Sequence, residues 1–188
     1  MRLFLALQLP PELQKRLLKL QEELESADWS VRFTPPEKLH LSLHFLGETP
    51  DNLLEDLRHD LGALMHARRA FDLSVGGLGA FPTLEDPRVL WAGVHGRGAA
   101  LEDLFEASYK ILKGYRIFEL KREFTPHITL GRVSQLKASW DPRRLEGLMG
   151  QWEKLGRLPV DELALFKSQT HPDGAIYEKI QSYKLTGV

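Results

Sequence analysis

Two short stretches of the sequence each place a histidine two positions before a hydroxyl residue. The first, HLS at 40–42, lies within PPEKLHLSLHFLGE, and the second, HIT at 127–129, lies within FTPHITLGR. Imidazole has a reference pKa of about 6.5, so near neutral pH one ring can donate a proton while another accepts one. Two facing rings suit displacement at phosphorus, with the hydroxyl groups donating hydrogen bonds to phosphoryl oxygens as charge develops. This chemistry requires neither a metal nor a cofactor.

If both motifs lie in strands, each imidazole points to the same side as its hydroxyl. Side chains alternate between the two faces of a strand, so His40 shares a face with Ser42. His127 shares a face with Thr129 in the same way. The opposite faces are apolar and are expected to be buried: Leu41, Leu43 and Phe45 in the first strand, Ile128 and Leu130 in the second. The paired polar faces predict one site that both strands share.

Arg132 follows the second histidine by five positions. A guanidinium group can hold two phosphate oxygens through its planar fork. Arg132 is therefore a candidate phosphate ligand, provided that the strand or the turn after it curves toward the motif. The alternative is an exposed ion pair at the edge of the strand, which contributes about 0 to 1 kcal/mol.

A metal site is a rival interpretation of the same histidines. Alternation puts His44 on the same face as His40, so these two and His127 could form a three-histidine zinc site with an open position. The first two rings are four strand residues apart, which is about 13 Å at 3.3 Å per residue. That separation is too long for two ligands of one ion in a regular strand, so the acid and base interpretation is favoured.

A third interpretation is a protein that binds RNA ends without turning them over. Phe33 or Phe124 could stack on a base. The basic residues near the motifs are Arg32, Lys38, Lys121, Arg122 and Arg132. For Lys121 and Arg122 a solvated rim is the simpler explanation. Two histidines and two hydroxyls are more than simple binding needs, which favours an enzyme.

The hydrophobic pattern predicts strands and helices in mixed order. Alternation or short apolar runs predict strands at 2–9, 38–48, 71–81, 87–96 and 125–133, and two more around an Asp-Gly turn within 159–185. Helical spacing predicts helices at 10–26, 49–69, 100–115 and 141–156, the second of them capped by Thr49 or Asp51. Strands in hairpin-like pairs among helices favour an α+β fold over a doubly wound parallel sheet.

Length and composition set the remaining bounds. The 188 residues, 43% apolar and 27% charged, fit a single domain that could divide into two small lobes, without a membrane-spanning run. The formal net charge of −1 argues against coating long nucleic acids, but not against a pocket for one phosphate. There is no cysteine, which excludes disulfides and thiol nucleophiles and fits a reducing cytoplasm. The apolar N-terminal stretch is interpreted as a first strand and not as a signal peptide.

Five segments together resemble a known family. They are RLFLALQLPPEL, RFTPPEKLHLSLHFLGE, PRVLWAGV, FTPHITLGR and LFKSQTHPDGAIYEKIQSYKL. In order and spacing they resemble the RNA 2',3'-cyclic phosphodiesterases of the two-histidine phosphoesterase superfamily, also called the 2'-5' RNA ligase family. The resemblance covers nearly the whole chain. His44 stands where the family often has a basic or variable residue.

The resemblance implies a fold and an activity. The fold is bilobal α+β and forms one domain over residues 1–188. Its two similar lobes have antiparallel sheets that face a central cleft, and the helices lie outside the sheets. The activity is opening of RNA 2',3'-cyclic phosphate ends to 2'-phosphates, with reverse joining to a 2'-5' linkage in some members. By position, His40 resembles the proton donor to the departing 3' oxygen and His127 the base for water. Ser42, in place of the commoner threonine, and Thr129 match the hydroxyl positions, and Arg132 matches the phosphate-contacting arginine. No membrane or obligate protein partner is expected.

Overall fold

The computed structural model describes residues 1–27, 29–96, 99–116, 124–135, 139–172 and 174–187. Its strands are β1 (Arg2–Gln8), β2 (Val31–Phe33), β3 (His40–Glu48), β4 (Phe71–Pro82), β5 (Pro87–Gly96), β6 (His127–Val133), β7 (Gly156–Val160), β8 (Glu162–Gln169) and β9 (Ile176–Lys184). Its α-helices are α1 (Pro11–Glu25), α2 (Leu54–His66), α3 (Ala100–Gly114) and α4 (Pro142–Gln151). Two short 3-10 helices, η1 (Pro36–Lys38) and η2 (Asp51–Leu53), precede β3 and α2.

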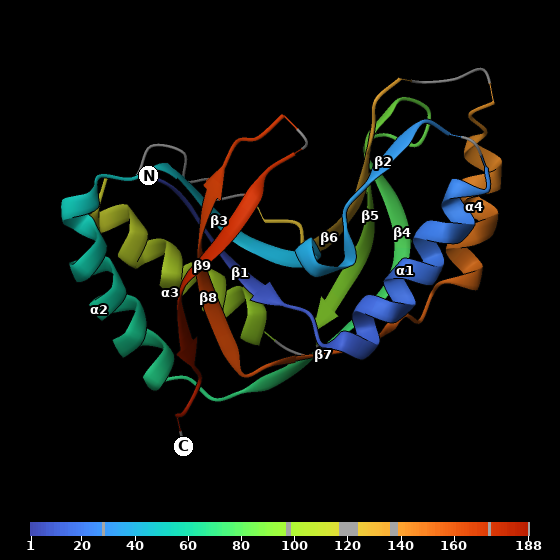
Figure 1. The fold of residues 1–188 in the computed structure, drawn as a ribbon. Helices are drawn as coiled ribbons and strands as arrows, with labels where there is room; N and C mark the ends of the chain where they lie inside the picture. Colours follow the sequence, from blue (N-terminus) through green and yellow to red (C-terminus); the bar gives the residue numbers. More distant parts are fainter. Residues whose placement is uncertain (28, 97–98, 117–123, 136–138, 173, 188) are drawn as a thin grey trace.

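The strands form one curled antiparallel sheet in the order β7-β4-β5-β6-β3-β1-β8-β9, with β2 paired to β6. One half of the sheet is β3, β1, β8 and β9, and the other is β6, β5, β4 and β7 with β2. The halves meet where β3 and β6 pair at Leu41 and Ile128. Figure 1 shows α2 and α3 beside the first half, and α1 and α4 beside the second. The predicted α+β fold is confirmed, with the two halves continuous through the centre of the sheet.

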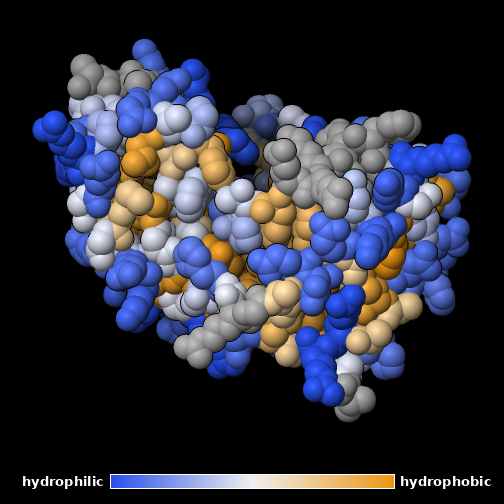
Figure 2. Space-filling view, turned by 180° about the vertical axis from the view of Figure 1, so that it is seen from behind, coloured by the Kyte–Doolittle hydropathy of each residue, from blue (hydrophilic) through white to orange (hydrophobic). Residues whose placement is uncertain are grey.

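The helices cover the sheet because each buries one apolar stripe. In α1 the buried leucines recur at helical spacing: Leu13, Leu17, Leu20 and Leu24. In α2 the corresponding residues are Leu57, Leu61 and Met65. These side chains join strand residues such as Leu5 and Leu41 in the main hydrophobic core. Seen from behind, hydrophilic residues dominate the outline and hydrophobic ones show between them (Figure 2).

Most predicted elements are confirmed, with differences at their ends. The sequence patterns missed β2 and β7, and the latter begins where the fourth predicted helix was expected to end. The predicted cap of α2 was wrong: η2 leads into the helix, and the residue before it, Leu53, makes no side-chain cap. In the C-terminal hairpin, Asp173 of the Asp-Gly signal lies outside the described residues. No helix in the described part of the chain combines the length and hydropathy needed to cross a membrane.

Candidate active site

The five residues singled out from the sequence line a single cleft. His40 and Ser42 on β3 face His127, Thr129 and Arg132 on β6 around a cavity of about 220 Å³. The remaining walls come from Lys38, one of the basic residues noted near the motifs, and from residues that the sequence analysis did not assign to a site, namely Thr34, Phe45, Phe81, Val89 and Tyr177. The predicted meeting of the two motifs is therefore present in the structure.

Each of the two histidines is oriented by a hydrogen bond of the same kind. The Nδ1 atom of His40 lies 2.7 Å from the carbonyl oxygen of Lys38, and the Nδ1 atom of His127 lies 2.8 Å from the carbonyl oxygen of Thr125. A carbonyl can only accept, so each ring donates its Nδ1–H and keeps the proton on that nitrogen in the neutral form. In each case the acceptor is the residue two positions earlier. The Nε2 atoms are thereby left as the groups that can exchange protons with a ligand.

Aromatic rings flank both imidazoles. Phe4 and Tyr177 lie 5.1 and 5.5 Å from the ring of His40, measured between centroids. Phe81 lies edge-on to His127 at 5.1 Å. Around His40, burial lowers the pKa of the imidazole because it disfavours the charged form. The hydrogen bond to the carbonyl of Lys38 raises the pKa of His40, and the charge of His127 lowers it further.

A bulge in β3 reverses the expected orientation of two side chains. Across β1, Ala6 pairs with Ser42 and Leu5 pairs with His44, so Leu43 is an extra residue that interrupts the alternation. His44 is consequently buried, at 2% exposure, and Phe45 turns toward the cleft with 59% exposure. The expectation that His44 shares the face of His40, and that Phe45 is buried with the leucines, was wrong for this reason.

His44 is held on the helical side of the sheet. Its Nε2 atom lies 3.1 Å from the carbonyl oxygen of Phe105 and 3.0 Å from the hydroxyl of Ser108, both on α3. Its ring stacks on Phe105 at 4.2 Å. Burial lowers the pKa of His44 to about 4. Because this ring points away from the cleft, the three-histidine zinc set with His40 and His127 is not formed.

A second bulge turns Arg132 into the cleft. Across β5, Leu90 pairs with Gly131 and Trp91 pairs with Thr129, so Leu130 is the extra residue. Strict alternation would have put Arg132 on the face opposite His127, and the bulge restores it to the cleft wall. The carbonyl of Leu130 accepts a hydrogen bond of 2.8 Å from the buried side chain of Gln21 on α1. This contact fixes the bulge from the helical side.

The residues suggested for RNA binding divide into two groups. Lys38 lines the cleft, whereas Arg32 is exposed and pairs with Arg132 across β2 and β6. Phe33 and Phe124 pack against the core, and Phe124 stacks on Phe105 at 4.4 Å. The rings on the cleft are instead those of Phe45, Phe81 and Tyr177. Lys121 and Arg122 lie outside the described residues.

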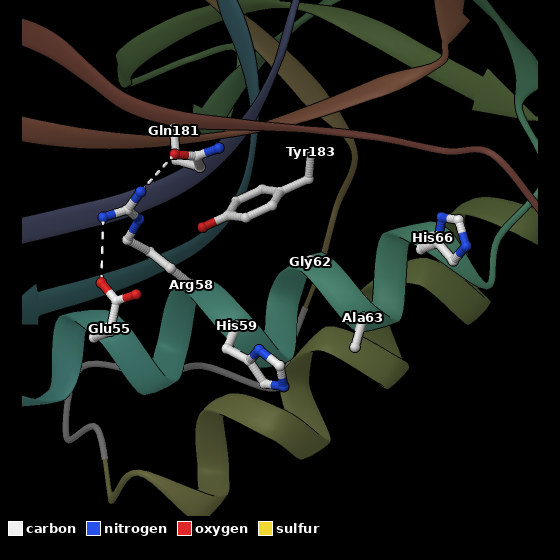
Figure 3. A pocket seen from close by; sticks show the side chains of 8 residues that line it. All are labelled: Glu55, Arg58, His59, Gly62, Ala63, His66, Gln181 and Tyr183. Atoms are coloured by element: carbon white, nitrogen blue, oxygen red, sulfur yellow. Dashed lines mark hydrogen bonds and ion pairs between the residues drawn. The ribbon is translucent and has the colours of Figure 1, made fainter.

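A larger cavity, about 470 Å³, lies between α2 and β9 and contains none of the motif residues. Figure 3 shows Arg58 between Glu55 and Gln181, at 3.4 and 2.9 Å. The Tyr183 hydroxyl is buried and has no hydrogen-bond partner among the described residues. The lining also includes His59 and His66 on α2, but neither histidine is followed two positions later by a hydroxyl residue. The cleft between the two motifs is the better candidate for chemistry.

The chain is similar in sequence to known phosphoesterases. The family model described as "LigT like Phosphoesterase" matches residues 7–91 and 98–177. A Thermus thermophilus protein named RNA 2',3'-cyclic phosphodiesterase is 35% identical, over 100% of this chain and 91% of its own length. A Methanothermobacter thermautotrophicus protein of the same name is 30% identical, over 98% of each chain.

A solved structure shows that the likeness extends to the whole fold. The crystal structure of TT0787 from Thermus thermophilus superposes with a TM-score of 0.83, at 29% sequence identity. The match covers 100% of this chain and 99% of that one. The two matched segments of the family model include both histidine motifs and the strands that carry them. The chain belongs to the LigT-like phosphoesterase family.

Proposed function

We propose that this protein hydrolyses RNA ends bearing a 2',3'-cyclic phosphate to 2'-phosphates by acid and base catalysis. The observation that carries the proposal is the matched pair of histidines, each bonded through Nδ1 to the carbonyl two residues earlier, on one cleft. The names of the two relatives above supply the substrate class. The reaction uses side chains alone, so no metal or cofactor is required.

In the proposed reaction water attacks phosphorus from the side of His127. The Nε2 atom of His127 accepts the proton of the water as the new phosphorus–oxygen bond forms. The bond from phosphorus to the 3' oxygen breaks, and the Nε2–H of His40 donates its proton to that oxygen. The products are a 2'-phosphate and a free 3' hydroxyl. Proton exchange with solvent then returns the histidines to their starting states.

Three further groups act on the phosphate. The hydroxyls of Ser42 and Thr129 donate hydrogen bonds to non-bridging oxygens, which gain negative charge in the transition state. The guanidinium of Arg132, which the bulge at Leu130 turns into the cleft, donates charge-assisted hydrogen bonds to the phosphate. All three side chains line the same cleft as the histidines, which supports these roles.

The lowered pKa of His40 has two consequences for the proposed acid. When protonated, a ring of lower pKa is a stronger acid and transfers its proton more readily to the departing oxygen. The protonated ring is also less populated in the free enzyme, because burial and the neighbouring His127 both oppose it. An anionic phosphate between the rings favours the protonated form. We therefore propose that substrate binding brings the proton to His40.

Two features of the setting complete the proposal. If a 5' hydroxyl attacks the cyclic phosphate in place of water, the same groups join two RNA ends through a 2'-5' linkage, so ligation is an expected minor activity. The location we propose is the cytoplasm, in line with a chain that has no cysteine. The partners are RNA ends or nucleotides with a cyclic phosphate, and we propose no obligate protein partner.

The direct test is to incubate the protein with a nucleoside 2',3'-cyclic phosphate in excess EDTA and identify the monophosphate formed. The proposal predicts turnover that chelation leaves unchanged and a 2'-phosphate product. A 3'-phosphate product would reverse the positions of acid and base relative to the sugar. Binding without any turnover would instead indicate a protein that only binds RNA ends, and loss of turnover in EDTA would indicate a metal hydrolase.

A further inference from the structure

A second groove adjoins the cleft on the His40 side. It is a cavity of about 310 Å³ on the half of the sheet formed by β3, β1, β8 and β9. We call it the Tyr177 groove and define it by six of its lining residues: Phe4, Lys38, Phe166, Ile176, Tyr177 and Lys179. Lys38, His40 and Tyr177 line both this groove and the cleft, so the two spaces are neighbours. We propose that the groove binds the nucleotide that precedes the terminal one in a single-stranded RNA.

The size of the catalytic cleft makes a second binding space necessary for RNA. At about 220 Å³ the cleft is smaller than the roughly 300 to 1,000 Å³ of pockets that enclose a whole small molecule. It can take the cyclic phosphate and part of the terminal nucleoside. The rest of an RNA strand must lie on the surface beside it, and the Tyr177 groove is the adjoining cavity.

The exposed apolar side chains also point to this surface. Large hydrophobic residues that are exposed in the described part of the chain are Phe45 at 59%, Ile176 at 46% and Leu18 at 38%. Phe45 lines the cleft and Ile176 lines the groove, whereas Leu18 lies on α1 beside the other half of the sheet. Exposed apolar side chains next to a polar catalytic cleft are suited to contact the faces of nucleic-acid bases.

The groove combines aromatic rings with cationic groups. Tyr177 stands edge-on to Phe4 at 5.0 Å and forms the wall between groove and cleft. Lys38 donates from Nζ to the carbonyl of Ala175 at 3.0 Å, which ties η1 to the β8–β9 hairpin. Lys179 donates to Gln8 at 2.9 Å. Rings and ammonium groups side by side are the combination by which proteins bind single-stranded nucleic acid without reading its sequence.

The charges in the groove are not all positive. Glu37 is an acidic lining residue, and Lys179 lies 3.9 Å from Glu162. One phosphate between two nucleosides could be held by the two lysines, while a long tract of phosphates could not. The groove therefore fits one additional nucleotide, in line with the net charge of −1 of the whole chain.

The direction of the RNA follows from the proposed reaction, on which this inference rests. If His40 protonates the departing 3' oxygen, the ribose lies on the His40 side of the phosphorus and the attacking water on the His127 side. The rest of the RNA is attached to that ribose through its 5' carbon. The strand thus leaves the phosphate on the half of the sheet that carries Tyr177 and Ile176, and not toward Phe81.

The test measures binding, so it does not depend on turnover. The His127→Ala protein is titrated with cytidine 2'-monophosphate and with a cytidine trinucleotide that ends in a 2'-phosphate. We expect the trinucleotide to bind about tenfold tighter, because a stacked base typically contributes that much or more. In a protein that also carries Ile176→Glu, the ratio of the two affinities should fall to nearly one. Leu18→Glu is the matched control, with the same charge change at an exposed apolar residue away from the groove.

Each outcome decides the inference. A trinucleotide advantage that Ile176→Glu removes and Leu18→Glu retains establishes the groove as the additional site. No advantage, or equal loss in the two glutamate variants, overturns it. The proposed hydrolysis is judged separately, by turnover of the cyclic phosphate in wild-type protein. Groove binding without turnover would leave the site in place and refute the catalytic proposal.

Discussion

Leu41 of β3 and Ile128 of β6 pair at the centre of the sheet, where the two halves meet. The motif residues flank this pair, because His40 and Ser42 stand on either side of Leu41 in the chain and His127 and Thr129 on either side of Ile128. A phosphate between the strands would meet one imidazole and one hydroxyl from each side.

The hydroxyls should act on turnover more than on stability. Ser42→Ala and Thr129→Val each remove one hydrogen-bond donor from the cleft while keeping a small side chain. We expect kcat to fall by about 10- to 100-fold in each, since the missing bond matters most as charge builds on the phosphate. Steady-state kinetics together with thermal unfolding will check this. Thr129→Ser, which keeps the hydroxyl, serves as the control; equal losses in Thr129→Ser and Thr129→Val would remove the hydroxyl from the mechanism.

The contribution of Arg132 to catalysis should depend on the planar shape of its guanidinium as well as on its charge. Arg132→Ala should lower both kcat and kcat/KM, and Arg132→Lys should recover only part of the loss because lysine lacks the planar fork. The measurement is both kinetic constants with a cyclic nucleotide, and the thermal midpoint of each variant. Arg32→Ala is the control, because Arg32 is the exposed neighbour across β2 and does not line the cleft. An unchanged kcat/KM in Arg132→Ala would exclude Arg132 from the site.

The pH dependence of kcat/KM should be bell-shaped, because catalysis needs one protonated and one neutral ring in the same pair. Activity is lost on the acid side when the pair takes a second proton. Burial of His40 and the charge of His127 both lower the pKa for that step, so the acid limb should lie below the ordinary value of about 6.5. The profile should be measured at constant ionic strength. A rate that does not change between acid and alkaline pH would contradict proton transfer by both rings.

His44 should make the free energy of unfolding decrease at acid pH. Its pKa is about 4 when folded, against about 6.5 when unfolded, so the unfolded state binds more protons between these values. Stability is therefore lost as pH falls through this window, by about 3 kcal/mol between pH 7 and pH 4 for this residue. Denaturant unfolding at several pH values should show a shallower loss in His44→Gln than in wild type. Parallel curves for the two proteins would contradict the assignment.

The elements and the motif pair could be predicted from the sequence because both depend on local periodicity. Alternation identified the strands that carry His40 and His127, and the resemblance in the surrounding segments supplied their chemistry. Alternation failed where a strand carries an extra residue. The bulges at Leu43 and Leu130 decide that Phe45 and Arg132 reach the cleft and that His44 does not. A bulge depends on the register with the neighbouring strand, which a single sequence does not specify.

The aromatic walls were missed for a related reason. Tyr177 comes from the C-terminal hairpin, far along the chain from either motif, and reaches His40 only because β9 lies next to β8 and β8 next to β1. Phe33 and Phe124, which are near the motifs in sequence, pack against the core and do not line the cleft. The spacing of residues within the two motifs identified the reacting groups but not the surface around them.

The most direct measurement is the rate at which a nucleoside 2',3'-cyclic phosphate is hydrolysed in EDTA by wild type, His40→Ala and His127→Ala. A general acid or base typically contributes about 10²- to 10⁴-fold, so each single variant should retain less than about a hundredth of the wild-type kcat. His59→Ala, which changes a histidine on α2 outside the cleft, should retain full activity. If either cleft variant folds normally and keeps more than about a tenth of the wild-type kcat, the two-histidine account is contradicted at that residue.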